Sequence, residues 1–545
     1  MGRFVNPDNS AFQVALNSKI YMDKTGLLEY TNSVLDTPEA YICNSRPRRF
    51  GKSYTANMLA AYYSKGCDSE KMFDGLTIGK SSDFKKHLNK YDVIHIDVQW
   101  FLSSCADIKS IISYITQSVL EELKEYYPEV LPNEVLTLAD ALSRIRNSTG
   151  QKFIVIIDEW DILIRDEATN KAVQEEYIYF LRGLFKGTEP TKYIQLAYLT
   201  GILPIKKEKT QSALNNFDEF TMVSAGTLAP FIGFTEEEVF HALEENGLSD
   251  EKGTVRYWYD GFSFGKRKDI YNPWSITKYL DTGEYGTYWA DTSGNMLISN
   301  LIRRSPAKIK TEMEDLLNGR VICTELDEQV IFEQLGRKRG AIWSLMLASG
   351  YLKVDRYEMD NRTGKRQYDL KVTNHETMLM FEQMIEDWFT EEDSAYGNFK
   401  DALLAGDLDY MNQFMNQVAL QTFSSFDTGG KPSEELEPER FYHGFVLGLI
   451  VDLAGKYRIT SNRESGFGRY DVVMEPLKEN LDAIVMEFKV QNTSKEKSLE
   501  ETVEHALRQI QEKQYDTELL ARGIAKERIR YYGFAFRGKK VLIGN

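Results

Sequence analysis

Two apolar runs, Asp471-Val472-Val473 and Ala483-Ile484-Val485-Met486-Glu487-Phe488-Lys489, carry charged residues near the C-terminal end of the chain. Residues i and i+2 of a β-strand point to the same face, so Glu487 and Lys489 are expected to lie side by side. If the two runs pair as a hairpin, Asp471 joins them. Two carboxylates and a lysine in one pocket can hold Mg²⁺ and activate a water for attack on a phosphodiester. The alternative is an ordinary hairpin with exposed charges, because short motifs also occur by chance.

This spacing resembles that of the PD-(D/E)XK nuclease superfamily, with Asp471, Glu487 and Lys489 as its Asp, Glu and Lys. The resemblance implies a central mixed sheet flanked by helices. It also implies that the two acids bind a metal ion, Mg²⁺ or alternatively Mn²⁺. The lysine would orient the attacking water or stabilise the developing charge.

Two further segments resemble parts of RecB-like members of that superfamily. The helical pattern from Leu499 to Tyr515 resembles their Q-x-x-x-Y helix. Gln511 and Tyr515 have this spacing, and Gln509 is an alternative for the glutamine. His443 opens an apolar helical segment upstream, where RecB-like members place a histidine near the metal. The alternative for His443 is a solvated residue at a helix start.

The second signal lies in the N-terminal part, where the apolar run from Tyr41 leads to Arg46-Pro47-Arg48-Arg49-Phe50-Gly51-Lys52-Ser53. In a P-loop, Gly51 would permit close approach to phosphate, and Lys52 would reach the β- and γ-phosphates of ATP. The Ser53 hydroxyl would ligate Mg²⁺, and the following helix N-terminus would add partial positive charge.

The loop departs from the P-loop pattern G-x-x-x-x-G-K-[ST], because Arg46 stands where the first glycine is required. Pro47 also removes one N–H from the phosphate cradle. Arg48 and Arg49 are therefore expected to supply positive charge in its place.

A partner motif strengthens the prediction of a nucleotide site. The buried-strand pattern Phe153 to Ile157 ends in Asp158-Glu159, where open α/β sheets bind ligands. Asp158 is expected to hold Mg²⁺ through water, and Glu159 to polarise the hydrolytic water. Another predicted strand ends in Thr200, at the usual place of a γ-phosphate sensor. The alternative for Asp158-Glu159 is a plain turn at a strand end.

Several strings along the chain together resemble one bacterial family, the predicted AAA-ATPase-like proteins that end in a PD-(D/E)XK nuclease domain. The resemblance covers nearly the whole chain, and within it the missing first glycine of the P-loop looks like a family trait. The strings, in chain order, are Tyr21-Met22-Asp23-Lys24-Thr25, the loop 46–53, Leu199-Thr200-Gly201-Ile202, Trp258-Tyr259-Asp260-Gly261-Phe262 and Tyr271-Asn272-Pro273-Trp274-Ser275.

The expected fold class is α/β with several domains, since single cores stop growing well below 545 residues. The N-terminal part is expected to be a doubly wound parallel sheet, and the middle to consist of short helices with a winged-helix-like element near 342–354. The best linker candidate is the proline-bearing segment 431–439. The predicted domains are 1–234 (AAA-ATPase-like), 235–375 (helical lid or winged-helix-like), 376–430 (helical connector) and 431–545 (nuclease).

Composition excludes several classes. No apolar run is long enough to span a bilayer, which takes about 18 residues. The four cysteines are scattered without C-x-x-C spacing, which argues against zinc ribbons and disulfide frameworks. A reducing cytoplasm is therefore the expected location. The net charge of −16 disfavours non-specific coating of nucleic acid but allows a local basic channel.

Together these features predict an ATP-binding, ATP-hydrolysing, Mg²⁺-dependent nuclease that cleaves nucleic acid, DNA rather than RNA, under nucleotide control. The alternative is a nucleotide-dependent switch or assembly protein whose nuclease-like domain binds nucleic acid or a partner without efficient cleavage. Arg303-Arg304 could act as an arginine finger in a homo-oligomer, with plain surface charge as the alternative.

Overall fold

The structure is a computed structural model of the chain. It separates into two compact units, residues 1–290 with 323–377 and residues 291–322 with 378–545. The finer division into four domains stays a prediction. Among the residues that the structure describes, no helix has both the length and the apolar character needed to cross a bilayer. The structure describes all residues except 132–136, 166–170, 205–213, 290–297, 299–300, 303–306, 318, 327–338, 360–361, 363–364, 391–394, 423–445, 448, 451–452, 454, 466–467, 479–480, 494 and 538–539.

The first unit is built on a five-stranded sheet with the order β2-β3-β4-β1-β5, in which every neighbouring pair is parallel. Every residue of β1 and β3 is buried, as expected for strands covered on both faces. The edge strand β5 has three residues and was not predicted. The strands are β1 (Tyr41–Ser45), β2 (Asp92–Asp97), β3 (Phe153–Asp158), β4 (Ile194–Gly201) and β5 (Asp218–Phe220).

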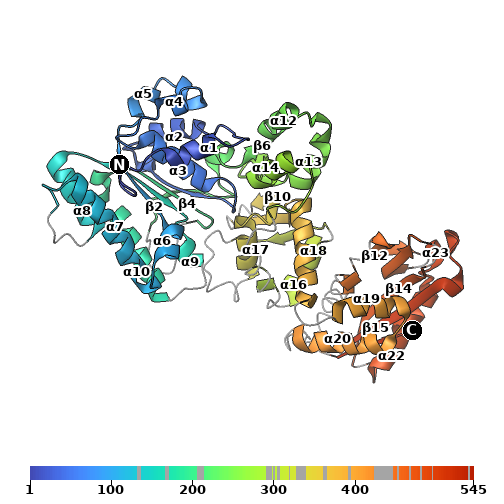
Figure 1. Cartoon of the computed structure of the whole chain (residues 1–545). Helices are drawn as coiled ribbons and strands as arrows, with labels where there is room; N and C mark the ends of the chain where they lie inside the picture. Colours follow the sequence, from blue (N-terminus) through green and yellow to red (C-terminus); the bar gives the residue numbers. More distant parts are fainter. Residues whose placement is uncertain are drawn as a thin grey trace. The chain divides into compact units, whose positions relative to one another are not determined.

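Helices cover both faces of this sheet, so the doubly wound architecture is confirmed. Figure 1 shows α1 and α3 on one side of β2 and β4, and α7, α8 and α10 on the other. The longer helices are α1 (Ser10–Leu16), α2 (Gly26–Val34), α3 (Lys52–Tyr63), α7 (Ile111–Tyr126), α8 (Leu138–Thr149) and α10 (Lys171–Phe185). The short ones are α4 (Glu70–Phe73), α5 (Phe84–His87), α6 (Val98–Ser104), α9 (Ile162–Arg165) and α11 (Pro190–Tyr193).

The lid region (residues 235–375) contains more strand than the sequence predicted. A small sheet β6-β8-β7 packs with three helices, of which α12 begins with a capping box of Thr235 and Glu238. Strands this short lack a periodic signal, which is why they were missed. The elements are β6 (Phe234–Thr235), α12 (Glu236–Glu245), α13 (Lys252–Tyr259), β7 (Phe262–Phe264), β8 (Arg267–Tyr271) and α14 (Pro273–Thr282).

The expected helix-turn-strand near 342–354 is present. Helix α17 (Arg339–Ala348) leads through a tight turn into β10 (Leu352–Met359), which pairs with β11 (Arg366–Val372) as a hairpin. Strand β9 (Ile322–Thr324) completes this three-stranded sheet.

The second unit contains a mixed five-stranded sheet with the order β12-β13-β14-β15-β16, in which only β14 and β15 are parallel. Its strands are β12 (Tyr457–Ser465), β13 (Gly468–Pro476), β14 (Ala483–Val490), β15 (Ile529–Arg537) and β16 (Lys540–Gly544). Its helices are α16 (Ala307–Leu317), most of α18 (His375–Thr390), α19 (Ala395–Ala405), α20 (Leu408–Thr422), α22 (Leu499–Lys513) and α23 (Thr517–Ala521).

Alternate residues of β14 belong to different cores. Ile484, Met486 and Phe488 pack with residues of α19 and α20, whereas Ala483 and Val485 pack with residues of α22 and α23. Because side chains alternate along a strand, Glu487 points to the α22 side.

Helix α20 protects the outer edge of the sheet. The side-chain amide of Asn412 both donates to the carbonyl of Ile543 (2.9 Å) and accepts from its N–H (2.7 Å). Asn416 makes the same pair of bonds to Val541, at 2.7 and 2.9 Å. Side chains at i and i+4 of a helix share one face, so two asparagines occupy alternate backbone positions of an otherwise open edge.

Candidate active sites

The first predicted site lies where the loop 46–53 enters helix α3. Gly51 is the N-cap with φ 86°, a left-handed conformation that glycine adopts without strain. A side chain at this position would meet no heavy atom within 4 Å, so space is open in front of the helix N-terminus. Arg49 is also left-handed, with φ 63°. The loop therefore combines two left-handed residues with a helix N-terminus, a shape that gathers N–H groups around an anion.

Lys52 lies at the base of this loop and is almost fully buried, with 4% of its side chain exposed. Its Nζ donates to the carbonyl of Pro47 at 3.1 Å and lies 3.5 Å from the Glu159 carboxylate. The lysine of the loop and the glutamate after β3 are therefore in contact.

Asp158 ends β3 beside other polar groups of the sheet edge. In register it lies opposite Asp97 on β2 and Thr200 on β4. Burial raises the pKa of Asp158 to about 7, the neighbouring Glu159 adds to the shift, and a hydrogen bond with Ser53 opposes it. A bound divalent cation would favour the ionised form, so a buried carboxyl beside the Ser53 hydroxyl suits Mg²⁺.

Thr200 is fully buried at the end of β4, between Asn44 of β1 and Asp158 of β3. Its hydroxyl has no hydrogen-bond partner among the residues described. A phosphate oxygen reaching this edge of the sheet would supply one.

Glu159 is held by a second cation that the sequence analysis did not single out. Arg165 forms an ion pair with Glu159 and, through Nε, a 3.0 Å bond with Asp161. Burial alone would raise the pKa of Glu159, but Lys52 and Arg165 outweigh it and the pKa lies below its usual value. Glu159 also has φ 50°, an uncommon conformation for a residue with a side chain.

Asp161 connects this ion pair to the end of β4. It is fully buried, and its Oδ2 accepts the backbone N–H groups of Ile202 (3.1 Å) and Leu203 (2.8 Å). The strand that carries Thr200 is thereby joined through Asp161 and Arg165 to Glu159. The spacing of Asp161 and Arg165, four residues apart behind Asp158-Glu159, was the available signal.

The three arginines of the loop lie in different surroundings. Arg46 is fully buried, where it donates to the carbonyls of Ser45 and Phe220, and burial lowers its pKa to about 10. Arg48 is half-buried, and its pKa is lowered by burial and by the nearby charge of Arg165. Arg49 is exposed, with its guanidinium 4.7 Å from the ring centre of Trp274 in the lid region. Of the two predicted charge donors, Arg48 is therefore the one near Glu159.

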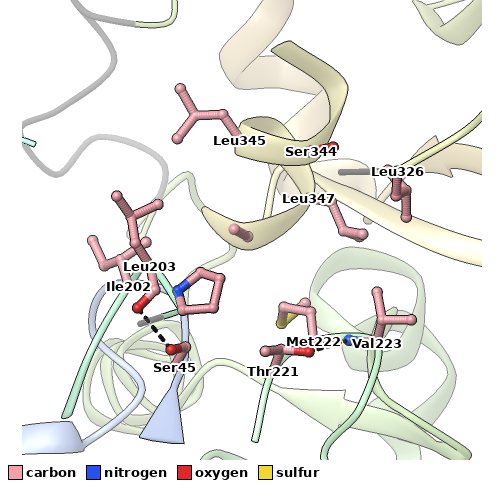
Figure 2. Close-up of a pocket in the computed structure, with 12 residues that line it drawn as sticks. Ser45, Ile202, Leu203, Thr221, Met222, Val223, Leu326, Ser344, Leu345 and Leu347 are labelled. Carbon is pink, nitrogen blue, oxygen red and sulfur yellow. Dashed lines mark hydrogen bonds between the residues drawn. The ribbon is translucent and has the colours of Figure 1, made fainter. Parts of the chain in front are cut away.

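An apolar pocket lies next to the nucleotide site, on the side of β5. Figure 2 shows Ile202 and Leu203 facing Leu345 and Leu347 of α17, with Met222 beside them. Its volume of about 30 Å³ suits one or two water-sized molecules and is too small for a nucleotide base. The predicted nucleotide site therefore stays the open space in front of α3, and not this pocket.

The second predicted site forms between β13 and β14. These strands pair antiparallel, with Val472 opposite Met486, and continuing this register places Asp471 opposite Glu487 on the same face. The Asp471 carboxylate accepts the N–H of Phe488 at 2.8 Å, and Lys489 lies 3.2 Å from Glu487. Glu487 is 2% exposed. The structure therefore brings Asp471, Glu487 and Lys489 together.

Helix α22 adds Gln509 to this group, the turn after it adds Tyr515, and Gln511 is left out. Gln509 donates to the Glu487 carboxylate and to the Tyr515 hydroxyl, the latter at 2.9 Å. Burial raises the pKa of Tyr515, and the charge of Glu487 adds to the shift. Gln511 is exposed. His443, Arg303-Arg304 and the linker segment 431–439 lie outside the described residues.

The donor set of this second site suits a hard cation. Mg²⁺ is commonly bound through one or two carboxylates, with waters and substrate phosphate completing the shell. Asp471 and Glu487 supply such a pair, and no cluster of three or more His, Cys, Asp or Glu side chains with metal-binding geometry occurs among the residues described. The site thus fits a cation that takes two ligands from the protein and the rest from water and a substrate phosphate.

Comparisons with known proteins agree with the predicted two-part architecture. Residues 11–210 match the family model described as Predicted AAA-ATPase, and residues 437–545 match the PD-(D/E)XK nuclease superfamily. The predicted architecture and fold class are thereby confirmed. An Azotobacter chroococcum mcd 1 protein, described as an uncharacterized protein in the vnfD 5' region, is 23% identical over 396 residues, which is 71% of this chain and 71% of its own.

Similar solved structures include the Aeropyrum pernix ORC2 protein in ADPNP-ADP complexes. It is 12% identical with a TM-score of 0.30, covering 70% of this chain and 99% of its own. PCH-2 of C. elegans is 10% identical with a TM-score of 0.21, covering 62% of this chain and 72% of its own.

Proposed function

We propose that this chain, which joins an AAA-ATPase-like segment to a PD-(D/E)XK nuclease-like segment, is an ATP-binding, ATP-hydrolysing and Mg²⁺-dependent nuclease acting on DNA. The observation that carries the proposal is the convergence of Asp471, Glu487 and Lys489 from two strands, with Gln509 from helix α22 and Tyr515 from the turn after it. Four polar side chains of these types gathered around the buried Glu487 carboxylate are hard to explain as packing.

At the nuclease site, each residue has a role that follows from its contacts. Asp471 and Glu487 would hold the cation, which lowers the pKa of a bound water and polarises the phosphate. The Phe488 N–H fixes the Asp471 carboxylate, and Gln509 fixes that of Glu487. Lys489, 3.2 Å from Glu487, would orient the attacking water or balance charge on the phosphate.

At the nucleotide site, Lys52 and the N–H groups of the loop would bind the phosphates of ATP. Ser53 and Asp158, which share a hydrogen bond, would hold Mg²⁺. When Lys52 moves to the phosphates, Glu159 keeps Arg165 as its partner and can polarise the hydrolytic water.

A nucleotide-dependent switch without efficient cleavage is the second candidate. The observation that favours it is that Oε1 of Glu487 is contacted by both Lys489 and Gln509. A metal ion that binds Oε1 would have to compete with these two donors.

A substrate panel separates the two candidates. Linear, circular and single-stranded DNA and RNA are incubated with Mg²⁺ or Mn²⁺, with and without ATP, and with the wild type, Lys52→Ala or Glu487→Ala. We expect the wild type to cleave DNA and Glu487→Ala to leave it intact. In Lys52→Ala, the rate of cleavage should no longer depend on ATP. Intact substrates under every condition, together with ATP binding that depends on Lys52, would contradict the nuclease and support the nucleotide-dependent switch.

A further inference from the structure

One backbone carbonyl of the nucleotide loop is held by two side chains of the lid region. The carbonyl of Arg48 accepts a hydrogen bond from Nδ2 of Asn272 at 3.3 Å and from the indole Nε1 of Trp289 at 3.0 Å. These donors are 224 and 241 positions away in the sequence. Both side chains are buried, so water does not readily replace them.

The orientation of this carbonyl fixes the next N–H. In a trans peptide the C=O of one residue and the N–H of the next point in opposite directions, and the described residues contain no cis peptide bond. Holding the Arg48 carbonyl toward the lid therefore directs the Arg49 N–H away from the lid. Arg49 is left-handed, as is Gly51, so this N–H belongs to the concave turn before α3.

Both donors are themselves fixed by one buried carboxylate. Glu376 is fully buried, and it accepts the backbone N–H of Trp289 at 2.6 Å and the hydroxyl of Ser275 at 2.9 Å. Ser275 lies in the first turn of α14, whose N-cap is Asn272. The Asn272 side chain is thus used twice, because its Oδ1 caps α14 while its Nδ2 reaches the loop.

Other contacts show that the lid region covers this loop closely. A side chain on Gly350 would come within 2.9 Å of Pro47, so glycine is needed for their approach. The ring of Phe50 packs 4.8 Å from that of Phe262. Apolar packing of this kind would hold the loop in place, but it does not select the direction of a peptide group. The two hydrogen bonds do.

We propose that Asn272, Trp289 and Glu376, here called the lid clamp, set the Arg48–Arg49 peptide for phosphate binding and make nucleotide affinity depend on the start of α18. This inference rests on the proposed nucleotide binding. It assigns a role to Asn272-Pro273-Trp274-Ser275, which the sequence analysis left without one. The link to α18 is covalent: Glu376 lies in its first turn, two positions before the second unit resumes at residue 378. By linkage, whatever shifts this turn changes ATP affinity, and ATP shifts this turn.

Three substitutions test the clamp while sparing other contacts. Trp289→Phe removes the indole N–H and keeps most of the ring. Asn272→Ser keeps an N-cap oxygen for α14 and removes the Nδ2 donor. Glu376→Ala removes the shared carboxylate, and Glu376→Gln keeps an acceptor for the Trp289 N–H. The matched control is Tyr285→Phe, which also removes one donor in the same region: the Tyr285 hydroxyl bonds to the Glu251 carboxylate at 2.8 Å.

The measurement is calorimetric titration of the full-length chain with Mg²⁺ and either ATP or ADP, at a temperature well below each variant's melting midpoint. We expect Trp289→Phe and Asn272→Ser each to raise Kd about 3- to 10-fold, the value of one hydrogen bond. Glu376→Ala should weaken binding similarly and Glu376→Gln should restore most of it. Tyr285→Phe should stay within about twofold of the wild type.

Two different failures can be told apart. If the wild type binds neither nucleotide, the proposed function fails at this site. If the wild type binds in a Lys52-dependent way while Trp289→Phe and Asn272→Ser bind equally well, the clamp is refuted and nucleotide binding stands. A variant that does not fold is replaced by the other, because each removes a different donor to the same carbonyl.

Discussion

Gln509 donates its side-chain N–H to the carboxylate of Glu487, across 22 positions of sequence and from a helix to a strand. The same nitrogen lies 2.9 Å from the Tyr515 hydroxyl. This pairing settles which of two glutamines reaches the site. It also gives Glu487, buried against α22, a donor that fixes the plane of its carboxylate.

We therefore expect Gln509→Ala to lower Mg²⁺-dependent cleavage about 10- to 100-fold, as is typical when a metal ligand loses its supporting hydrogen bond. Gln511→Ala is the matched control on the same helix and should change the rate by less than about twofold. Initial cleavage rates over a series of Mg²⁺ concentrations measure both. Equal effects of the two substitutions would contradict the role of Gln509.

Arg165 should matter for ATP turnover more than for ATP binding, because it contacts Glu159 and Asp161 and not the phosphate loop. Arg165→Met is expected to lower kcat for ATP hydrolysis about 10- to 100-fold while KM changes little. The reason is that a misplaced Glu159 weakens stabilisation of the transition state and leaves ATP binding unchanged. Arg165→Lys should recover part of the loss.

The control for this prediction is Arg182→Met, an exposed arginine on α10. Steady-state phosphate release at several ATP concentrations separates kcat from KM. A rise in KM with unchanged kcat would show that Arg165 serves binding instead.

Asp260 should make the first unit less stable as pH rises. Burial, and next the charge of Asp269, raise its pKa to about 6. An unfolded aspartate titrates near 4, so between about pH 4 and 6 the folded state binds the extra proton. Stability from this group is present below about pH 4 and is lost as pH rises through 6.

Asp260→Asn is uncharged throughout and keeps an oxygen for the Gly261 N–H, which lies 2.6 Å from Asp260 in the wild type. The melting temperatures of variant and wild type should therefore agree at pH 4 and diverge up to pH 6, with the variant higher. Thermal melts at half-unit pH steps measure the difference. A constant difference across this range would be inconsistent with the raised pKa.

Asn412 and Asn416 should protect the edge strand β16 from exchange. Replacing either with Ala removes its two hydrogen bonds to β16, at a cost of about 1–2 kcal/mol to the local stability of this strand. Hydrogen exchange of a peptide covering 540–544 should accelerate in each variant and most in the double variant. Gln413→Ala, an exposed neighbour on the same helix, is the control and should leave exchange unchanged. Unchanged exchange in the double variant would mean that the edge is held by packing alone.

Local patterns in the sequence predicted both candidate sites because their key residues obey short-range geometry. Glu487 and Lys489 share a strand face, and Asp158-Glu159 follows a continuously buried strand. The Gly51-Lys52-Ser53 turn leads directly into a helix. Each of these relations depends only on the spacing within one element.

The choice between Gln509 and Gln511 shows where such reasoning stops. Gln511 and Tyr515 are four residues apart and would share a face of a continuous helix. The helix ends at Lys513, however, and Gln514 turns left-handed with φ 51°. The Tyr515 N–H then bonds to the carbonyl of Ile510, which brings its ring beside Gln509. The left-handed Gln514 at the helix end therefore makes Gln509, and not Gln511, the partner of Tyr515.

The short strands could not be predicted from the sequence for a related reason. Strands β5, β6 and β7 have two or three residues each and are defined by their neighbours. A segment of that length shows no period of its own.

The residue types, their order and their spacing within single elements were thus determined by the sequence alone, and with them the two domain families. The tertiary structure alone decided that Gln509 joins Glu487, and that Asn272 and Trp289 hold the Arg48 carbonyl. These partners belong to different elements, and Asn272 and Trp289 lie more than 220 positions from Arg48 in the sequence. Which side chains meet across such separations depends on how helices and sheets pack, and no local pattern encodes that packing.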